Sequence, residues 1–156
     1  NKSNWIKKHI SSIKNNYSRS DNYFFFEKYI LPIYAKKYDN IAELNIEIID
    51  VIIKKYFKSN VKILRQKDLF TQNHGSNLIL EICKKNNATK YISGPGGKNY
   101  LDLIKFKEND IVVEFISNEL PLEYKQQYNK IPYIGDISAL DFVLNTKDDY
   151  KKYINL

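Results

Sequence analysis

The sequence contains very little sulfur. Cys83 is the one cysteine among 156 residues, and there is no methionine. A lone cysteine excludes an intrachain disulfide, and its place in an apolar helical pattern predicts a small buried side chain. The missing disulfide framework favours a reducing compartment such as the cytoplasm. Because the chain begins with Asn1 and has no methionine, we expect it to be a fragment of a longer protein.

Sequence features of metal sites and membrane spans are also missing. His9 and His74 are the two histidines, and no group of His, Cys, Asp and Glu has the spacing of metal ligands. No apolar run approaches the roughly 20 residues that a membrane span requires. No signal peptide is recognisable. We therefore expect neither a metal site nor a membrane span.

Arginine is scarce although the chain is basic. The net charge is +7, and Arg19 and Arg65 are the only arginines, so lysine carries almost all of the positive charge. Specific recognition of bases and phosphates favours the planar guanidinium of arginine. The composition therefore disfavours a nucleic-acid partner, although the charge itself keeps nucleic-acid binding as a second alternative.

The composition is otherwise that of a folded protein, with 43% hydrophobic residues, and the length suits one domain. Apolar side chains at three- and four-residue spacing predict three amphipathic helices in the N-terminal part, residues 1–58. The second helix contains Pro32, which should kink or divide it. The third follows Asn40, which is expected to cap it. The three predicted helices cover about residues 3–18, 21–34 and 41–57.

After residue 58 the pattern changes to alternating strands and helices. This order predicts a parallel sheet, in a part that covers residues 59–146. A last helix near residues 139–143 would be capped by Asp136 or Ser138, and residues 147–156 form a charged tail. The predicted fold class is α/β, with an N-terminal bundle of about three helices followed by a small, parallel, Rossmann-like βαβαβ sheet. The alternating elements are strand 61–64, helix 76–83, strand 91–93, helix 99–106 and strand 111–116.

Three of the five glycines lie in one loop between the second predicted strand and the helix that follows. Glycine is used where backbone takes positive φ or approaches a ligand closely. Such a turn aims backbone N–H groups at an anion such as phosphate or carboxylate. The loop matches neither the Walker motif nor G-x-G-x-x-G, so a tight turn without a ligand stays open. The candidate substrate-binding residues are Ser93, Gly94, Gly96, Gly97 and Lys98 for the anion, and Tyr100 and Asp102 for hydroxyl groups.

Four further residues have side chains suited to catalysis or binding. His9 lies on the apolar face of the first predicted helix, either as a half-buried structural residue or as a general base. Asp141 stands between two apolar residues, so its carboxylate should bond to backbone or face a polar cavity. Tyr124 and Gln126 in the long loop would bind a sugar or a base by stacking and amide hydrogen bonds, or would only pin the loop.

Taken in order, several of these segments resemble the WbqC-like proteins. The similarity extends from about residue 4 to residue 145. The His-Gln-Pro motif with which family members usually begin has no counterpart in this chain. The segments that carry the resemblance are Trp5-Ile6-Lys7-Lys8-His9, Tyr17, Tyr91-Ile92-Ser93-Gly94, Tyr100-Leu101, Tyr124 with Gln126, and Ile137-Ser138-Ala139-Leu140-Asp141-Phe142.

The resemblance implies a cytoplasmic, bacterial transferase of surface-polysaccharide (O-antigen, lipopolysaccharide) biosynthesis. Transfer of an aminoacyl group, such as glycine, to an amino sugar is one activity that it implies. The expected partner is a small-molecule substrate, a nucleotide-sugar or an activated amino acid, and no cofactor is expected beyond a nucleotide-linked donor. His9 and Asp141 would then be the catalytic residues. A non-catalytic module that binds a ligand or a protein is the alternative, and a homo-oligomer stays open.

Overall fold

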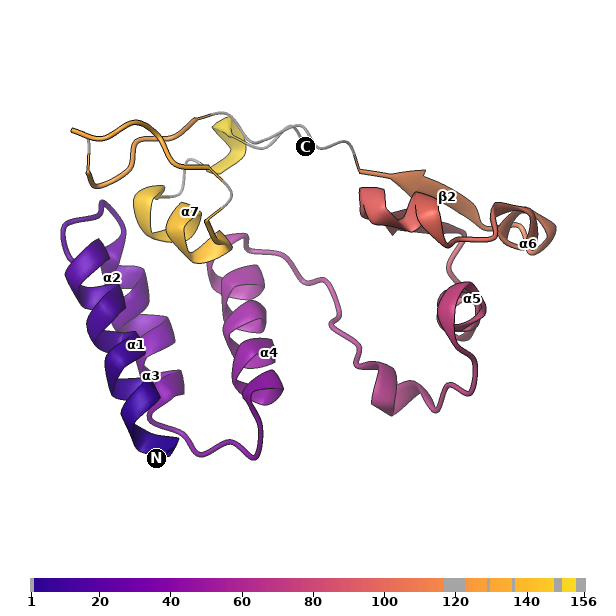
Figure 1. Ribbon diagram of the computed structural model, residues 1–156, viewed down its shortest axis with the longest axis horizontal. Coiled ribbons are helices and arrows are strands. Elements are labelled where there is room, and N and C mark those ends of the chain that lie inside the picture. The colour runs from indigo at the N-terminus through magenta and orange to yellow at the C-terminus, as the bar shows by residue number, and fades with distance from the viewer. Residues whose placement is uncertain (1, 117–122, 129, 136, 148–149, 154–156) are drawn as a thin grey trace. The chain divides into compact units, whose positions relative to one another are not determined.

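The computed structural model describes residues 2–116, 123–128, 130–135, 137–147 and 150–153 (Figure 1). The chain divides into two compact units. Unit 1 combines residues 1–61 with residues 120–156, and unit 2 comprises residues 62–119. Segments from both sides of unit 2 in the sequence therefore build unit 1.

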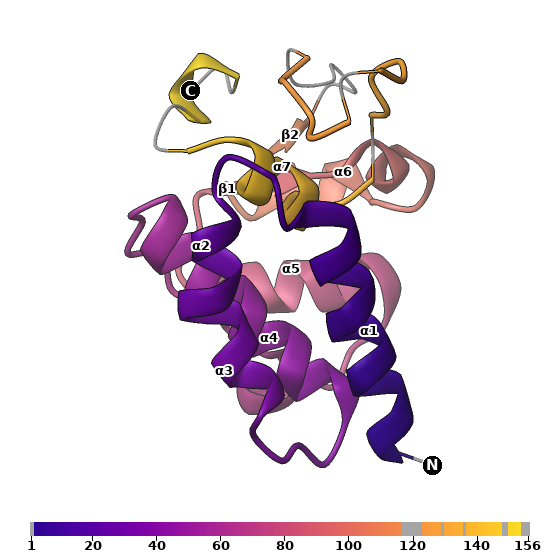
Figure 2. The same ribbon diagram turned by 90° about the vertical axis from the view of Figure 1, so that its left-hand side faces the viewer.

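Unit 1 is helical in its described part. Figures 1 and 2 show α1, the helical run that contains α2 and α3, and α4 side by side, with α7 across one end. The helical elements of unit 1 are α1 (Lys2–Tyr17), α2 (Tyr23–Phe25), the π-helical turn η1 (Phe26–Ile30), α3 (Leu31–Tyr34), α4 (Ile41–Val51), the π-helical turn η2 (Ile52–Tyr56), α7 (Ala139–Asn145) and the short 3-10 helix η5 (Tyr150–Lys152).

Pro32 explains why the second helical run is divided. Proline has no N–H to donate, and its ring clashes with the carbonyl of the residue four positions earlier. The preceding residues form a π-helical turn, in which the Leu31 N–H bonds the Phe26 carbonyl. Pro32 then lies in the first turn of α3, where its missing N–H costs little. The run stays helical through Pro32, and the expected kink or division takes the form of the π-helical turn that precedes this proline.

The core of unit 1 joins the N-terminal helices to the C-terminal segment. Phe26 and Ile30 have no exposed surface, and neither have Val143 and Leu144 of α7. The buried Tyr150 donates a hydrogen bond to the Phe57 carbonyl at 3.0 Å. A bundle of residues 1–58 alone therefore does not describe this unit, because α7 and η5 supply part of its core.

Unit 2 contains a small parallel sheet. β1 pairs with β2 in parallel, with Lys90 opposite Val112 and Ser93 opposite Phe115. The ring of Tyr91 stacks on Phe106, which is fully buried, so one face of the sheet is covered. The elements of unit 2 are η3 (Gln66–Leu69), α5 (Gly75–Lys85), β1 (Lys90–Ser93), η4 (Pro95–Asn99), α6 (Leu103–Glu108) and β2 (Val112–Phe115).

The prediction of a strand at residues 61–64 was wrong. Residues 61–64 have no regular structure, and the side chains of Val61 and Leu64 are 56% and 41% exposed. A strand needs a partner for its backbone groups, and the short apolar pattern of this segment specifies none. Among the described residues the expected Rossmann-like βαβαβ sheet is thus reduced to one βαβ unit, and the fold is a mixture of helices with a two-stranded parallel sheet.

Two helices begin at capping residues that the sequence predicted. The Asn40 side chain accepts a hydrogen bond from the Glu43 N–H at 3.1 Å and caps α4. The Ser138 hydroxyl accepts from the Leu140 N–H at 2.9 Å and begins α7, whereas Asp136 lies outside the described residues. In the part of the chain described here, none of the helices is both long and apolar enough to span a bilayer.

Candidate functional site

A cavity of about 420 Å³ opens in unit 1 between α1, α7 and the loop that precedes α7. His9 lies at its wall, and so does Asp141. Its aliphatic lining residues are Ile13, Ile131, Ile134, Ile137 and Leu140. The remaining wall is built mainly by hydroxyl and amide side chains, which include Ser12, Asn16, Tyr17, Gln126, Gln127 and Asn145.

Asp141 holds the polar wall together. Its side chain is only 3% exposed. The carboxylate accepts hydrogen bonds from the Tyr124 hydroxyl at 2.5 Å, from Gln126 Nε2 at 2.9 Å and from Asn145 Nδ2 at 3.1 Å. A buried carboxylate is stable when donors satisfy its oxygens in this way. Asp141 thereby fixes residues from α7 and from the loop in one arrangement.

Two tyrosine hydroxyls remain protonated beside this carboxylate. Burial raises the pKa of Tyr17, and the hydrogen bond and negative charge of Asp141 raise it further. Burial followed by the same interactions with Asp141 also raises the pKa of Tyr124. Both phenols therefore act as donors at neutral pH. Tyr17 lines the cavity, whereas Tyr124 is not among its lining residues and supports Asp141 from the core.

Both glutamines of the loop are held by their side chains. Gln126 donates to Asp141 and to the Ile134 carbonyl at 2.8 Å, and its own carbonyl accepts from the Ile134 N–H at 3.0 Å. The Gln127 side chain accepts from the Arg19 N–H at 2.6 Å, and its backbone N–H donates to Asn145 Oδ1 at 2.9 Å. The loop is therefore fixed to α7 and to the residues that follow α1.

His9 is exposed to solvent at the other side of the cavity. Its Nδ1 lies 3.1 Å from the hydroxyl of the buried Tyr34, and the two rings meet edge to face at 5.6 Å. If Nδ1 carries the proton and donates it to Tyr34, the lone pair of Nε2 is free to accept a proton. In that tautomer, His9 contacts Tyr34 through Nδ1 and presents Nε2 to a ligand.

The lining residues suit an uncharged polar ligand. Among those that the structure describes, Asp141 carries the one formal charge, and protein donors already satisfy it. Amides and hydroxyls can bond the hydroxyl groups of a sugar, while the isoleucine side can pack against the apolar face of a sugar ring. A phosphate group would find no cation in this lining.

The glycine loop has a different structure from the one expected. Residues 95–99 form a 3-10 helix, and Gly75 is the one described glycine with positive φ. At Gly97 a Cβ atom would lie 2.0 Å from Ser93 Oγ, so glycine is needed there for packing. Gly94 and Gly96 have open space around the Cβ position. Of the two reasons expected for these glycines, positive φ does not apply to Gly94, Gly96 or Gly97, and a close approach to a ligand stays a prediction.

The other residues of this loop have partners within unit 2. Ser93 is 2% exposed and donates to the Gly94 carbonyl at 3.0 Å. The Lys98 ammonium lies 5.4 Å from the centre of the Phe115 ring. The Asp102 carboxylate caps α6 by accepting from the Lys105 N–H at 3.3 Å, while Tyr100 is 54% exposed. The loop candidates therefore lie together in unit 2, whereas His9, Tyr124, Gln126 and Asp141 all belong to unit 1.

Several residues of the cavity were not identified from the sequence. Asn16 lies on α1 seven residues after His9, which places both on one helix face. Asn145 follows Asp141 by four residues on α7, a spacing that also aligns side chains. The spacing of these polar residues along each helix was the sequence signal that could have identified them as neighbours of His9 and Asp141. Among the described residues, no three His, Cys, Asp or Glu side chains are placed to hold a metal ion.

The comparison with known families identifies the class of protein. The WbqC-like protein family matches residues 1–153, so the chain belongs to this family. The chain is also 25% identical over 153 residues to the uncharacterized protein Rv1507c of Mycobacterium tuberculosis (strain ATCC 25618 / H37Rv). That match covers 96% of this chain and 65% of the relative, so the chain spans less than two thirds of the relative's length. No solved structure matches the chain.

Proposed function

We propose that unit 1 is the sugar-binding part of a WbqC-like transferase of bacterial surface-polysaccharide (O-antigen) biosynthesis. The observation that carries this proposal is the cavity that His9 shares with the polar network around Asp141. Its volume of about 420 Å³ lies in the range of small-molecule sites. The family supports a transferase role through the resemblance, and the uncharged lining supports a sugar as the ligand.

In this proposal the polar residues and the isoleucines of the cavity contact different parts of the sugar. Asn16 and Tyr17 line the cavity, and because the Asn16 amide nitrogen donates to the Ser12 carbonyl at 2.8 Å and the Tyr17 hydroxyl bonds Asp141, their oxygens are the atoms that can accept from sugar hydroxyls. Asp141 positions Gln126 and Tyr17 rather than reacting, because its oxygens are already bonded. The isoleucines exclude water from one face of the ring, which strengthens the polar contacts on the other face.

The proposed chemistry is transfer to a nucleophile of the bound sugar. A hydroxyl or amino group of the acceptor attacks the activated carbon of a nucleotide-linked sugar or an aminoacyl donor. The new bond to that carbon forms as the bond to the leaving group breaks, and His9 Nε2 takes the proton from the nucleophile. Positioning and general base catalysis supply the rate enhancement.

Binding of a sugar tests the proposal directly. N-acetylglucosamine and N-acetylgalactosamine, each free and linked to a uridine diphosphate, are titrated into the protein by calorimetry. We expect Asn16→Ala to weaken binding about fivefold to tenfold, because one hydrogen bond contributes about 1 kcal/mol. The matched control is Asn4→Ala, an exposed residue of α1 outside the cavity lining. Equal affinities of these two variants, or no binding by the unmodified protein, would overturn the proposal.

A binding module without catalysis is the second candidate. It is favoured by the saturated carboxylate of Asp141 and by the bond between His9 and Tyr34. His9→Ala separates the two functions. If the protein is a transferase, the His9→Ala variant still binds the sugar but no longer functions in cells. If the protein is a binding module, the variant keeps its sugar binding and its function in cells.

A module that binds a protein would need an exposed apolar surface. The four consecutive aromatic residues at 23–26 do not form one. Phe25 and Phe26 are buried, and Phe24 is 64% exposed with the Lys28 ammonium 5.3 Å from its ring centre. A single exposed ring beneath a lysine is not a contiguous apolar patch. We therefore place the binding function in the cavity.

A further inference from the structure

A small notch in unit 1 adjoins the cavity. Its volume is about 50 Å³, and it shares three wall residues with the cavity. Arg19, Asp21 and Lys125 surround the rest of it. The shared wall consists of Gln126, Gln127 and Asn145.

The notch contains the positive charge that the cavity lacks. Arg19 and Lys125 contribute two positive charges and Asp21 contributes one negative charge, which leaves a local excess of one positive charge. Within the described part of the chain, neither Arg19 nor Lys125 forms an ion pair. Two exposed and unpaired cations are available to an anion, and arginine binds phosphate oxygens in a bidentate manner.

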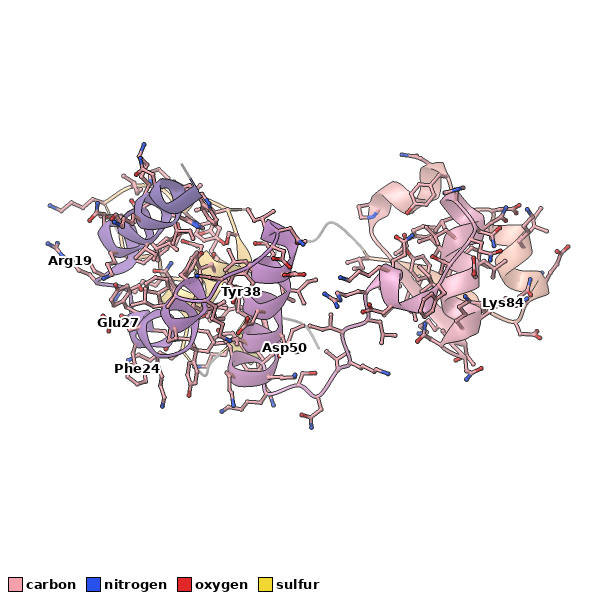
Figure 3. All side chains as sticks on the ribbon, turned by 90° about the horizontal axis from the view of Figure 1, so that it is seen from below. Arg19, Phe24, Glu27, Tyr38, Asp50 and Lys84 are labelled. Carbon is pink, nitrogen blue, oxygen red and sulfur yellow. The ribbon has the colours of Figure 1, made fainter. Side chains whose placement is uncertain are left out.

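The backbone that carries Arg19 is held in place. Its N–H donates to the Gln127 side chain at 2.6 Å, and Gln127 in turn donates to Asn145 of α7. Figure 3 shows Arg19 at the outer side of unit 1, where a ligand can reach it. The rim of the notch is therefore attached to the same network that shapes the cavity, while the guanidinium is free to turn toward a ligand.

We infer that the notch binds a phosphate ester carried by the sugar in the cavity. This inference rests on the proposed sugar-binding function of unit 1. The notch, at about 50 Å³, is much smaller than the adjoining cavity of about 420 Å³, so the compact phosphoryl group is assigned to the notch and the sugar ring to the cavity. The ligand is thus a sugar phosphate, either a sugar 1-phosphate or a nucleotide-linked sugar, with the ring against the isoleucines and the phosphate beside Arg19.

This assignment moves the anion site away from the glycine loop. Lys98, the cation expected there, lies over the Phe115 ring, and the Asp102 carboxylate caps α6. If the phosphate binds in the notch, substitution of Arg19 weakens its binding and substitution of Lys98 does not. If it binds at the glycine loop, the reverse is expected.

The test compares three forms of each of two sugars. N-acetylglucosamine and N-acetylgalactosamine are titrated as the free sugar, the 1-phosphate and the uridine diphosphate conjugate, each at low and at high salt. We expect a phosphate-bearing form to bind at least about tenfold more tightly than the free sugar, with a gain that falls as salt rises. Arg19→Gln and Lys125→Gln should each remove most of this gain and leave the affinity for the free sugar unchanged.

Two control variants have matched chemistry. Arg65→Gln removes the other arginine, which pairs with Asp68 in unit 2, and Lys98→Gln removes the cation of the glycine loop. Both control variants should keep the full gain in affinity that the phosphate group provides. Circular dichroism checks that all four variants melt as the unmodified protein does, which the exposed positions of Arg19, Lys98 and Lys125 and the half-buried position of Arg65 allow.

Each outcome has a defined meaning. If the free sugar binds but phosphate adds nothing, or if Lys98→Gln and not Arg19→Gln removes the gain, the inference is wrong and the sugar site stands. If no form of either sugar binds, both the proposed function and the inference fail. If the inference is correct, tighter binding of the diphosphate than of the 1-phosphate identifies a nucleotide-linked ligand, and equal binding identifies the monophosphate.

Discussion

Asp141 is the residue on which the shape of the cavity depends most. Tyr17, Tyr124, Gln126 and Asn145 bond to its carboxylate, and of these Gln126 and Asn145 also donate to a backbone carbonyl that remains when the carboxylate is removed. Buried polar groups without partners cost about 1–3 kcal/mol each. Because the tyrosine hydroxyls lose this acceptor, we expect Asp141→Ala to lower the free energy of unfolding by about 1–3 kcal/mol in urea denaturation. Asp39→Ala, at an exposed position of the same unit, should change it little, and similar effects of the two substitutions would contradict this role.

The tyrosines give unit 1 a specific sensitivity to alkaline pH. Burial and the neighbouring Asp141 raise the pKa of Tyr17 and Tyr124 above the ordinary value of 10.0. A raised pKa stabilises the folded state fully below pH 10 and loses this effect as the pH rises toward the folded-state pKa. We therefore expect thermal stability to fall steadily above pH 10. The double variant Tyr17→Phe with Tyr124→Phe should lose less stability over that interval, and an equal loss would contradict the assignment.

Gly97 and Gly96 differ in the reason for their glycine. A Cβ at Gly97 would collide with the buried Ser93, whereas a Cβ at Gly96 meets no atom within 4 Å. We expect Gly97→Ala to destabilise the protein by about 1–3 kcal/mol through overpacking. Gly96→Ala should leave stability unchanged or raise it by up to about 1 kcal/mol. Thermal melting of the two variants checks this difference, and equal effects would show that the loop adapts to either side chain.

At the scale of elements, Glu81 connects α5 to the segment before it. Its carboxylate accepts from the Gln72 and Asn73 N–H groups and from the Asn73 side chain, and it pairs with Lys85. These contacts, led by the Asn73 side chain, lower the pKa of Glu81 to about 2. A lowered pKa stabilises the folded state above the ordinary value near 4.5, and this contribution disappears as the pH falls toward 2.

Glu81→Gln tests this connection at neutral pH. We expect the backbone amides of Gln72 and Asn73 to exchange with deuterium faster in this variant, because the neutral side chain is a weaker acceptor than the carboxylate. Glu108→Gln, which changes an exposed residue of α6, serves as the control. Unchanged exchange in Glu81→Gln would mean that the segment is held by other contacts.

The elements that the sequence predicted well are those that carry their own signals. Asn40 and Ser138 cap helices whose apolar spacing was also visible, and the kink or division expected at Pro32 takes the form of a π-helical turn before it. The strand expected at 61–64 has no such local signal, because a strand depends on a partner elsewhere in the chain. The glycine loop was recognised as a turn, but its 3-10 conformation depends on the close packing of Gly97 against Ser93.

The candidate site was predicted residue by residue rather than as a cavity. His9, Asp141 and Gln126 were singled out from the sequence, and the structure brings them to one cavity. The cavity itself depends on the loop that precedes α7, which has no periodic pattern from which its course can be deduced. The notch beside Arg19 depends on the same loop. Neither volume follows from local sequence alone.

At the scale of the whole molecule, hydrogen exchange shows in which of the two units the ligand binds. The proposed site lies within unit 1, so a bound sugar phosphate should slow hydrogen exchange in α1, in the loop around residues 124–128 and in α7. Exchange in residues 93–98 of unit 2 should stay the same. Protection confined to residues 93–98 would instead place the ligand at the glycine loop.

The assembly of unit 1 from two separated stretches of sequence matters during translation. Its N-terminal helices leave the ribosome long before Val143 and Leu144, which fill the middle of the same core. At synthesis rates of about 5–20 residues per second, the delay is on the order of ten seconds. During that time Phe26 and Ile30 lack part of their native cover, whereas unit 2 is synthesised as one uninterrupted stretch. The apolar core of nascent unit 1 is therefore exposed for longer during synthesis than that of unit 2.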